Sequence, residues 1–423
     1  MDFIPQDKIA DNFIQCIRTG LIEQSSDTTV IFYDYDVLAA KINKLKSTFP
    51  AGTIHTTAIK ANPLIKILEK IRNTDLGAEV ASEGELFMAE KAGFNPSLIV
   101  FDSPAKTYNE LFLTLSKNIH INADSFMELE RIAEIKSRIN SSGKIGLRIN
   151  PQIGYGTIAL TSVAGNYSKF GVPVNEFRAE IIESFKKFDW LSGIHIHIGS
   201  QGYSMEMLLA GFEKILILIE EIESNINRKI SFVDIGGGLP VSYNKNTNPP
   251  DITEYGAKIQ DLLIKYKHQE IQLITEFGRY LHANSGYSIS KVEYVKHYKE
   301  SNTLIIHAGA DLFLRECLNP GQWPHDFTLL TNEGIIKTSK ATKKYHIAGP
   351  LCFAGDIIAK NIELPIAEES DYLVIHDTGG YTFGMWSRYV SRMFPKAILK
   401  SGNSFEIIKN REKSEDLYSF WSV

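Results

Sequence analysis

Four short runs of this sequence end in side chains that could do chemistry, and the first ends in a lysine. TIHTTAIK, rich in β-branched residues, predicts a strand that ends at Lys60. A lysine at the end of an apolar strand is costly to bury unless its amine is used. A Schiff base with a carbonyl cofactor is one such use, because it removes the charge from the amine. For Lys60 taken alone, an amine that reaches out to solvent is the open alternative.

Two histidines end the run IHIHIGSQ. His195 and His197 are two residues apart, so in a strand they share one face, while Ile194, Ile196 and Ile198 take the other. Two inward histidines could bind a metal, but the sequence offers no third ligand at a telling distance, and we predict no metal site. A flat imidazole can also stack on an aromatic ring. Ordinary core histidines are the alternative.

The last two runs end in glycines and in an acid. In DIGGGLP, Gly236, Gly237 and Gly238 allow the backbone to turn its N–H groups toward an anion, although a tight turn would explain them equally well. In TEFGR, Glu276 would face the site and Arg279 begins the next turn. A carboxylate facing a pyridine nitrogen keeps that nitrogen protonated and makes the ring a strong electron sink. A solvated acid paired with Arg279 is the alternative.

An alternation of strand-like and helix-like runs must position these residues. VIFYD (30–34) predicts a strand, and Asp36 is placed to cap the helix that follows. Capping boxes that begin at Ser82 and Ser125 open two later helices. The eight strands expected after VIFYD are TIHTTAIK, AEVA, LIVF, HINA, IGLRIN, IHIHIG, FVDIG and LITEF. Eight βα steps are what a TIM barrel needs, with working residues at the strands' C-terminal ends. The strand count alone does not exclude an open doubly wound sheet.

The pattern changes after about residue 285. Strand-like runs continue (SKVEYVKHY, TLIIHAG, KYHIAG, DYLVIHD and SFEIIK), but few helices intervene. The predicted class is therefore α/β: a (β/α)8 TIM barrel over residues 30–285, and an antiparallel β domain, a sandwich or barrel, over residues 1–29 and 286–423. The VIFYD strand could join the β domain.

Composition narrows the class of protein. The chain has 423 residues and a formal net charge of -5, with Lys and Arg scattered, which argues against a nucleic-acid partner. Cys16, Cys317 and Cys352 show no paired spacing, so we expect neither disulfides nor zinc, and a reducing compartment. We find no signal peptide and no apolar run long enough to span a membrane. We therefore predict a cytoplasmic protein.

Beyond these separate features, the sequence resembles the fold-type III pyridoxal-phosphate (PLP) decarboxylases, which act on diaminopimelate, ornithine or arginine, with alanine racemase more distant. The motifs that carry the resemblance run in the family's order from VIFYD to GGYTFGM, and they are AIKANP, AEVASEGEL, SKFGV, HIGSQ, DIGGG, E-x-GR, GPLC-x3-D and GGY. The resemblance implies the two-domain architecture of alanine racemase, with PLP in the barrel. It also implies an amino-acid substrate and a homodimer whose active sites form between subunits.

The resemblance also implies roles for single residues. Lys60 would carry PLP as a Schiff base, His197 would stack on its ring and Glu276 would hold the pyridinium nitrogen. Cys352 resembles the cysteine that crosses the dimer interface and helps to protonate Cα after carbon dioxide leaves. The other cofactor-binding residues implied are Ser200, Gly236, Gly237, Gly238, Gly278, Arg279 and Tyr381, of which Ser200, the three glycines and Tyr381 would bind the phosphate. Arg279 and Arg315 resemble the arginines that hold substrate carboxylates, and Tyr381 would line the same pocket.

One departure from the family bears on the substrate. Diaminopimelate and ornithine decarboxylases carry an acid directly after the interface cysteine, which receives the distal amine, but Phe353 stands at that position here. A phenyl ring cannot pair with an ammonium by charge, although a cation–π contact is conceivable. We therefore expect the distal amine to be absent or capped. Phe277, in place of the proline of E-P-G-R, leaves Glu276 and Arg279 in position.

A changed segment, HAGADLFLRECLNPGQWPHDF, points the same way. It keeps Arg315 but lacks the tyrosine that diaminopimelate decarboxylases use near this point. Trp323, His325 and Asp326 follow instead. They could line an enlarged substrate pocket, and an ordinary interface loop is the alternative. Siderophore-pathway relatives act on diamino acids whose distal amine is amide-linked to citrate. Our main hypothesis is therefore an N-citryl-diamino-acid decarboxylase, for example one for N-citrylornithine, with Arg315, His325 and Arg388 as donors to the carboxylates.

Three alternatives stay open. The first is a diaminopimelate decarboxylase that tolerates Phe353, the second an amino-acid racemase, and the third a non-catalytic PLP-binding protein on the same fold. Glu276 favours a decarboxylase over a racemase, because alanine racemases place an arginine against the ring nitrogen and weaken the electron sink. The β domain with Cys352 and Tyr381 argues against the non-catalytic alternative.

Overall fold

The computed structural model describes residues 3–299 and 301–423, which divide into two compact units. The barrel unit comprises Lys41–Val241 and Pro249–Tyr280, and the β unit comprises the described residues of Met1–Ala40, Ser242–Asn248 and Leu281–Val423. The predicted barrel boundaries, 30 and 285, therefore differ from the observed ones. The first strand and a short segment from the middle of the chain belong to the β unit.

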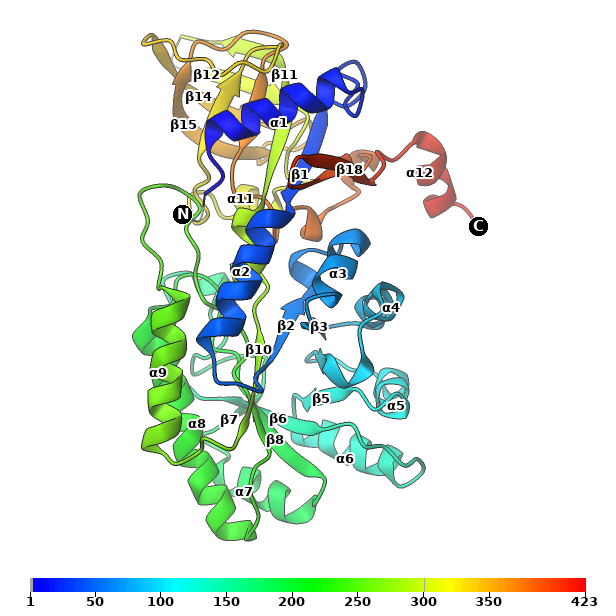
Figure 1. Ribbon diagram of the computed structural model, residues 1–423, viewed down its shortest axis with the longest axis vertical. Coiled ribbons are helices and arrows are strands. Elements are labelled where there is room, and N and C mark those ends of the chain that lie inside the picture. The colour runs from blue at the N-terminus through cyan, green and yellow to red at the C-terminus, as the bar shows by residue number, and fades with distance from the viewer. Residues whose placement is uncertain (1–2, 300) are drawn as a thin grey trace. The chain divides into compact units, whose positions relative to one another are not determined.

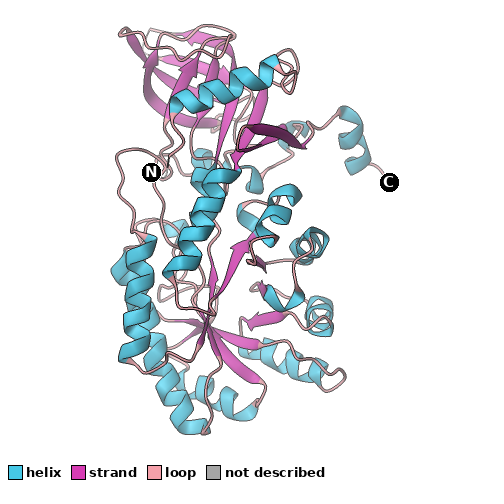
Figure 2. Ribbon diagram, in the orientation of Figure 1, coloured by secondary structure: helices cyan, strands magenta, loops and turns pink. Residues whose placement is uncertain are grey.

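Eight parallel strands of the described chain close into a barrel (Figures 1 and 2), which confirms the predicted TIM barrel and excludes an open sheet. They are β2 (Ile54–Ala58), β3 (Gly77–Val80), β4 (Ile99–Asp102), β5 (His120–Ala123), β6 (Ile145–Asn150), β8 (Leu191–His195), β9 (Phe232–Asp234) and β10 (Gln272–Glu276). Neighbouring strands pair in the order β5-β4-β3-β2-β10-β9-β8-β6, and pairing of β5 with β6 closes the ring. The two-residue strand β7 (Val172–Pro173) pairs beside β6.

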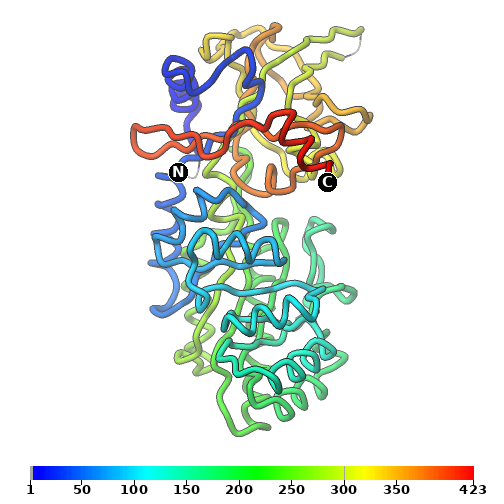
Figure 3. The backbone as a smooth tube through the Cα atoms, turned by 90° about the vertical axis from the view of Figure 1, so that its right-hand side faces the viewer, coloured from blue at the N-terminus to red at the C-terminus, as the bar shows by residue number. Residues whose placement is uncertain are grey.

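Helices follow most of these strands, and Figure 3 shows those after β3, β4 and β5 in chain order along the barrel, coloured from blue to cyan. The helices of the barrel are α2 (Tyr35–Thr48, which begins in the β unit), α3 (Ile65–Arg72), α4 (Glu83–Ala92), α5 (Tyr108–Ser116), α6 (Phe126–Lys136), α7 (Arg178–Lys187), α8 (Met205–Ile226), α9 (Ile252–Lys265) and α10 (Arg279–His282, which ends in the β unit). Within the described residues, no helix is both long and apolar enough to cross a membrane.

The predicted helix starts are observed with a change of detail. Ser82 caps α4 by accepting the N–H of Glu85, but the Glu85 carboxylate accepts the N–H of Ala81, one residue before the cap. At α2 the predicted cap, Asp36, is wrong, because Oδ1 of Asp34 accepts the N–H of Asp36 itself. These carboxylates satisfy N–H groups that a helix start leaves without partners.

The β unit is built on a mixed sheet rather than the antiparallel one predicted. Its nine strands in the described residues are β1 (Thr29–Asp34), β11 (Gly286–His297), β12 (Asn302–Ile306), β13 (Phe327–Leu330), β14 (Thr342–Ala348), β15 (Ile357–Pro365), β16 (Tyr372–Ile375), β17 (Lys396–Ser401) and β18 (Ser404–Lys409). β1 pairs parallel to β17, and β12 pairs parallel to β14. The helices are α1 (Gln6–Arg18), α11 (Leu314–Leu318) and α12 (Ser414–Trp421).

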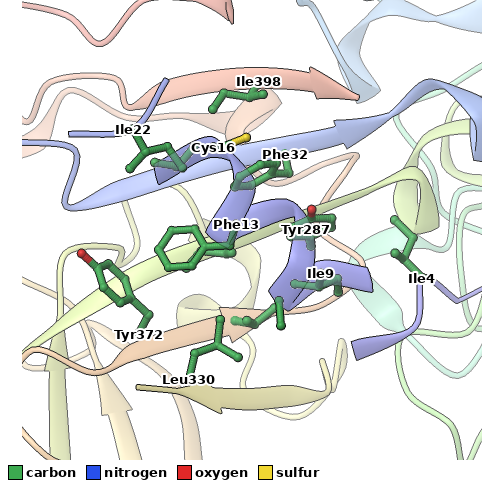
Figure 4. Packing of buried hydrophobic residues seen from close by; sticks show 14 residues of the cluster. Ile4, Ile9, Phe13, Cys16, Ile22, Phe32, Tyr287, Leu330, Tyr372 and Ile398 are labelled. Atoms are coloured by element: carbon green, nitrogen blue, oxygen red, sulfur yellow. The ribbon is translucent and has the colours of Figure 1, made fainter. Parts of the chain in front are cut away.

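Helix α1 covers one face of this sheet and buries an apolar cluster against it (Figure 4). Phe13 of α1 meets Tyr372 edge to face at 4.8 Å, and Phe32 of β1 stacks on Tyr287 at 4.9 Å. Pairing of β1 with β11 and β17 explains why the VIFYD strand belongs to the β unit.

Candidate active site

Lys60 lies in a turn just beyond the first barrel strand. β2 ends at Ala58, and Lys60 occupies the 3-10 turn Ile59–Ala61, not the strand's last position as predicted. Its Nζ donates a hydrogen bond to Oε2 of Glu79, a fully buried residue of β3. Burial raises the pKa of Glu79 to about 8, although the positive charge of Lys60 opposes the shift. The amine therefore contacts a carboxyl group that titrates near neutral pH.

His195 is the last residue of β8 and is completely buried among acids. Its Nδ1 lies 3.5 Å from Oδ1 of Asp102, and its Nε2 lies 3.7 Å from Oε2 of Glu276. Burial opposes a charge on this ring, but the charges of Asp102, Glu276 and Asp234 outweigh it and raise the pKa of His195 to about 9. His195 is therefore an imidazolium at neutral pH.

His197, two residues beyond the strand, is in the opposite state. Burial lowers its pKa, so the ring is neutral at neutral pH. Its Nδ1 accepts the backbone N–H of Gly237 at 3.3 Å, which places the ring proton on Nε2. A neutral, oriented, partly exposed ring suits stacking on a flat cofactor.

Glu276, the last residue of β10, is ionised in spite of its burial. Burial alone would raise its pKa, but the positive charges of His195 and Lys60 hold the pKa well below the usual range. Its Oε1 has no hydrogen-bond partner among the described residues. A buried, ionised and unpartnered oxygen is suited to a charged N–H donor from a ligand. The alternative of a solvated Glu276 is wrong.

The glycine turn after β9 has no room for side chains. A Cβ on Gly236, Gly237 or Gly238 would come within 2.0 to 2.6 Å of a backbone carbonyl oxygen. The Gly236 N–H is donated to Oδ1 of Asp234 and the Gly237 N–H to His197. Two of the three N–H groups predicted to face an anion are therefore already donated within the barrel.

Ser200 and Arg279 add polar groups to this end of the barrel. Arg279 donates from Nε and Nη2 to Oγ of Ser200, at 3.1 and 2.9 Å. Gly278 donates its N–H to the carbonyl of Glu276 at 3.1 Å. The structure thus brings together most of the site residues predicted for the barrel.

Sequence reasoning missed the acids around Glu276. Glu79, Asp102 and Asp234 come from β3, β4 and β9 and are all buried. The sequence feature that marks these three residues is an acid at or near the end of a predicted apolar strand. It also missed that Glu276 completes a possible metal-binding set, since its oxygen and one nitrogen each of His195 and His197 lie within 4.8 Å of one another.

The other predicted residues belong to the β unit. The guanidinium of Arg315, in α11, lies over the rings of Trp323 and Tyr381, 4.8 and 5.8 Å from their centroids. Both ring nitrogens of His325 are engaged, Nδ1 with the carbonyl of His376 at 2.6 Å and Nε2 with Oε1 of Glu316 at 3.1 Å. His325 therefore has no nitrogen left over for a ligand.

Cys352 and Phe353 lie in an exposed turn before β15. The Tyr389 hydroxyl donates to the carbonyl of Cys352 at 3.3 Å, and its ring meets that of Phe353 edge to face at 6.3 Å. Arg388 donates from both terminal nitrogens to Glu412, at 3.3 and 2.9 Å. This predicted carboxylate donor is therefore already paired.

Comparisons with known proteins agree with this geometry. Residues 36–283 match the family model for the pyridoxal-binding domain of pyridoxal-dependent decarboxylases. The chain belongs to this family. Its relatives include the diaminopimelate decarboxylases of Campylobacter jejuni, 29% identical over 93% of this chain and 96% of that protein, and of Zymomonas mobilis, 32% identical over 85% and 83%.

Solved structures extend the likeness to the whole architecture. Diaminopimelate decarboxylase from Helicobacter pylori, complexed with L-lysine, has a TM-score of 0.84 and 30% identity over 94% of this chain and 97% of that one. Lysine/ornithine decarboxylase from Vibrio vulnificus, with a TM-score of 0.78 but 19% identity over 92% of this chain and 98% of that one, shares the fold. This decarboxylase is thus a carboxy-lyase that depends on PLP, as predicted.

The residues present fit that cofactor. The neutral ring of His197 suits a flat heterocycle, and the unpartnered oxygen of Glu276 suits a protonated ring nitrogen. The glycine turn has no side chains, so a cofactor group can approach its backbone closely.

Proposed function

We propose that this decarboxylase removes the α-carboxyl group of a diamino acid, and that diaminopimelate is its best-supported substrate. The likeness to diaminopimelate decarboxylases over nearly the whole chain carries the proposal. The pairing of Lys60 with the buried Glu79, and the ionised Glu276, provide the chemical groups that such a reaction needs. The racemase and non-catalytic alternatives have no support from the relatives.

Bound PLP supplies an electron-withdrawing ring, which a decarboxylation requires. Lys60 would hold the cofactor, and Glu79 would accept or return the proton at Nζ because its pKa is near neutral. Glu276 would keep the ring nitrogen protonated through its negative charge, which His195 maintains. His197 would cover one face of the ring and exclude water from it.

The phosphate would be held by Ser200 and the Gly236–Gly238 turn, next to Arg279 and Gly278. The part of Tyr381 in phosphate binding, and that of Cys352 across a subunit interface, remain predictions from the family resemblance. The homodimer and the cytoplasmic location also remain predictions.

One observation favours a second candidate, a diamino acid with a capped distal amine such as N-citrylornithine. Phe353 is 40% exposed beside Cys352, where the resemblance expects an acid to receive an ammonium. Of the three donors predicted for the extra carboxylates, Arg388 and His325 are already engaged. Arg315 alone of the three keeps N–H groups without acceptors in the described chain.

A substrate panel tests both candidates. PLP-loaded enzyme is incubated with meso-diaminopimelate, N-citrylornithine, ornithine, lysine and arginine, and carbon dioxide release and product mass are followed. Fastest release from diaminopimelate supports the first candidate, and release from the citryl compound alone supports the second. No release from any of the five would refute both.

Phe353→Glu separates the two candidates independently. The new carboxylate would sit near the carboxylates of a citryl substrate and should raise its KM at least tenfold, because like charges repel. With diaminopimelate as the native substrate, the change should leave KM within about threefold. Phe353→Gln is the matched control, since it has similar size without the charge.

A further inference from the structure

The β unit contains a pocket that is lined entirely by its own residues. Its volume is about 330 Å³, and its walls come from residues 26, 28 and 29, the turn 307–312, Pro350, the segment 390–395 and Arg411. This volume is at the lower end of the range for small-molecule sites, so the pocket suits a compact ligand or a single chemical group. No step of the proposed decarboxylation uses its two arginines, Arg392 and Arg411.

Arg392 is fixed in the wall of this pocket but keeps an unsatisfied donor. Its Nη2 donates to the carbonyl of His307 at 2.8 Å. Its Nε is buried and has no hydrogen-bond partner among residues 3–299 and 301–423. Oδ2 of Asp311 lies 3.5 Å from that nitrogen, which is too long for a well-formed N–H···O bond. A buried N–H without an acceptor is rare and favours a ligand oxygen beside Arg392.

Arg411 is anchored in a similar way, by a neutral group. Its Nη1 donates to the carbonyl of Ser26, and its Nε lies 3.9 Å from Oδ1 of Asp27. The other oxygen of Asp27 accepts from Nζ of Lys396 at 2.5 Å, so this acid already has a cation of its own. A carbonyl anchor leaves the charge of a guanidinium in place. Both arginines therefore remain positively charged parts of the wall.

The charges of the lining do not cancel. Among the described residues that line the pocket, the guanidiniums of Arg392 and Arg411 face a single carboxylate, that of Asp311. Oδ1 of Asp311 also accepts two backbone N–H groups of its own turn, at 2.8 and 3.1 Å. Glu293 contacts Nε2 of His307 at 2.7 Å, but its side chain is 38% exposed and does not line the pocket. The lining therefore keeps one positive charge in excess even if His307 is neutral.

The segment that presents Arg392 has an unfavourable backbone conformation. Val390 and Ser391 both line the pocket and have φ angles of 58° and 52°, in the left-handed region. A β-branched residue such as Val390 avoids this region, and strained residues of this kind concentrate at ligand-binding sites. Ser391 and Thr28 add hydroxyl groups to the lining. The wall thus combines charged and neutral hydrogen-bond donors.

We propose that this pocket binds a phosphate group, held between the guanidiniums of Arg392 and Arg411. A guanidinium forms paired, charge-assisted hydrogen bonds with phosphate oxygens. A phosphate group offers at least three acceptor oxygens that are not in one plane with a single donor, so it reaches donors on different walls. The group belongs to inorganic phosphate or to a small phosphate monoester. The site goes beyond the proposed decarboxylation, and its test needs no amino-acid substrate.

The test is calorimetry of the PLP-loaded enzyme with inorganic phosphate, while cofactor absorbance shows that PLP stays bound. The wild type should bind phosphate with a dissociation constant of about 1 mM or lower. Arg392→Gln and Arg411→Gln should each raise this constant roughly tenfold, because each removes a charged hydrogen-bond donor. Arg392→Lys keeps the charge without the paired donors and should raise it by a smaller factor.

Controls separate a specific site from general attraction and from misfolding. Arg18→Gln removes one positive charge from the end of α1, outside the pocket lining, and should leave phosphate binding within about twofold of wild type because distant exposed charges are screened. Asp311→Asn removes the negative charge near Arg392 and should tighten binding about threefold. Urea unfolding without phosphate shows that each variant folds, and added phosphate should stabilise the wild type but not the two glutamine variants.

The choice of ligand distinguishes the source of the phosphate. Tighter binding of glycerol 3-phosphate than of inorganic phosphate would support a phosphorylated metabolite, and the reverse would support the free ion. Tighter binding of succinate, a dicarboxylate, than of both would overturn the phosphate assignment.

Other outcomes would overturn the site itself. These are the absence of phosphate binding by the wild type, unchanged binding in both glutamine variants, or an equal loss in Arg18→Gln. Weaker binding in Asp311→Asn would show that Arg392 depends on this acid and would overturn the availability of its Nε. None of these results depends on which amino acid the enzyme decarboxylates, so the site and the proposed function can fail separately.

Discussion

Replacing Gly237 by alanine should weaken PLP binding, although it adds or removes no ionisable group. An added Cβ would lie 2.3 Å from the carbonyl oxygen of Glu276, roughly 1 Å closer than an ordinary contact between nonbonded atoms. The backbone at Gly237 is outside the left-handed region, so the effect is purely steric. Because the obstructing atom is backbone, the end of β10 must shift, and Glu276 with it. Overpacking of this kind costs about 1–3 kcal/mol.

If that cost falls on the PLP-bound state, PLP affinity should decrease roughly tenfold to a hundredfold. The assay is a PLP titration of the apoenzyme followed by cofactor absorbance, together with urea unfolding of the apoenzyme. Gly84→Ala, in α4, is the matched control, because its Cβ would lie at an ordinary contact distance, 3.8 Å, from the Ser82 hydroxyl oxygen. It should bind PLP normally and gain up to about 1 kcal/mol from helix propensity. Wild-type PLP affinity in Gly237→Ala would refute the steric argument.

Three further predictions concern attachment of the cofactor, the β-unit core and acid stability. Lys60→Ala should abolish the PLP-sized mass increment that borohydride reduction leaves on the wild-type chain. Phe13→Ala should lower the urea unfolding free energy by about 3–5 kcal/mol, because the ring is buried against Tyr372. The Lys44 hydrogen bond lowers the pKa of Asp251 to about 2 from 3.8, so this stabilisation is complete above pH 3.8 and is lost as the pH falls toward 2. Asp251→Asn should lower the free energy of unfolding by roughly 0.2–1 kcal/mol at pH 7, a small effect because the Lys44–Asp251 pair is partly exposed. Near pH 2 the substitution should leave the free energy of unfolding unchanged.

Much of the barrel was predictable because its signals are local. Each strand is a short apolar run, several helices begin at a capping residue, and alternation of the two specifies a parallel sheet. Chemically useful residues at strand ends could then be assigned to one rim. This reasoning assigns Lys60, His197, the glycine turn and Glu276 to that rim, and their roles in binding the cofactor stay predictions.

The β unit was harder to predict for a physical reason. β1 pairs parallel to β17, more than 360 positions along the chain, and no periodicity in the sequence encodes such a pairing. The same holds for Glu316, whose carboxylate reaches a histidine nine positions away only because α11 and the following loop fold together.

The sequence by itself determined the barrel, the family and which residue types stand at the strand ends, because strand and helix periodicity and motif order are properties of neighbouring residues. Only the tertiary structure decided the charge states. His195 is a cation because Asp102, Asp234 and Glu276 converge on it from three other strands, and His197, two residues later, is neutral because burial dominates there. Desolvation and charge pairing depend on distances across the fold, and these exist only after the barrel has closed.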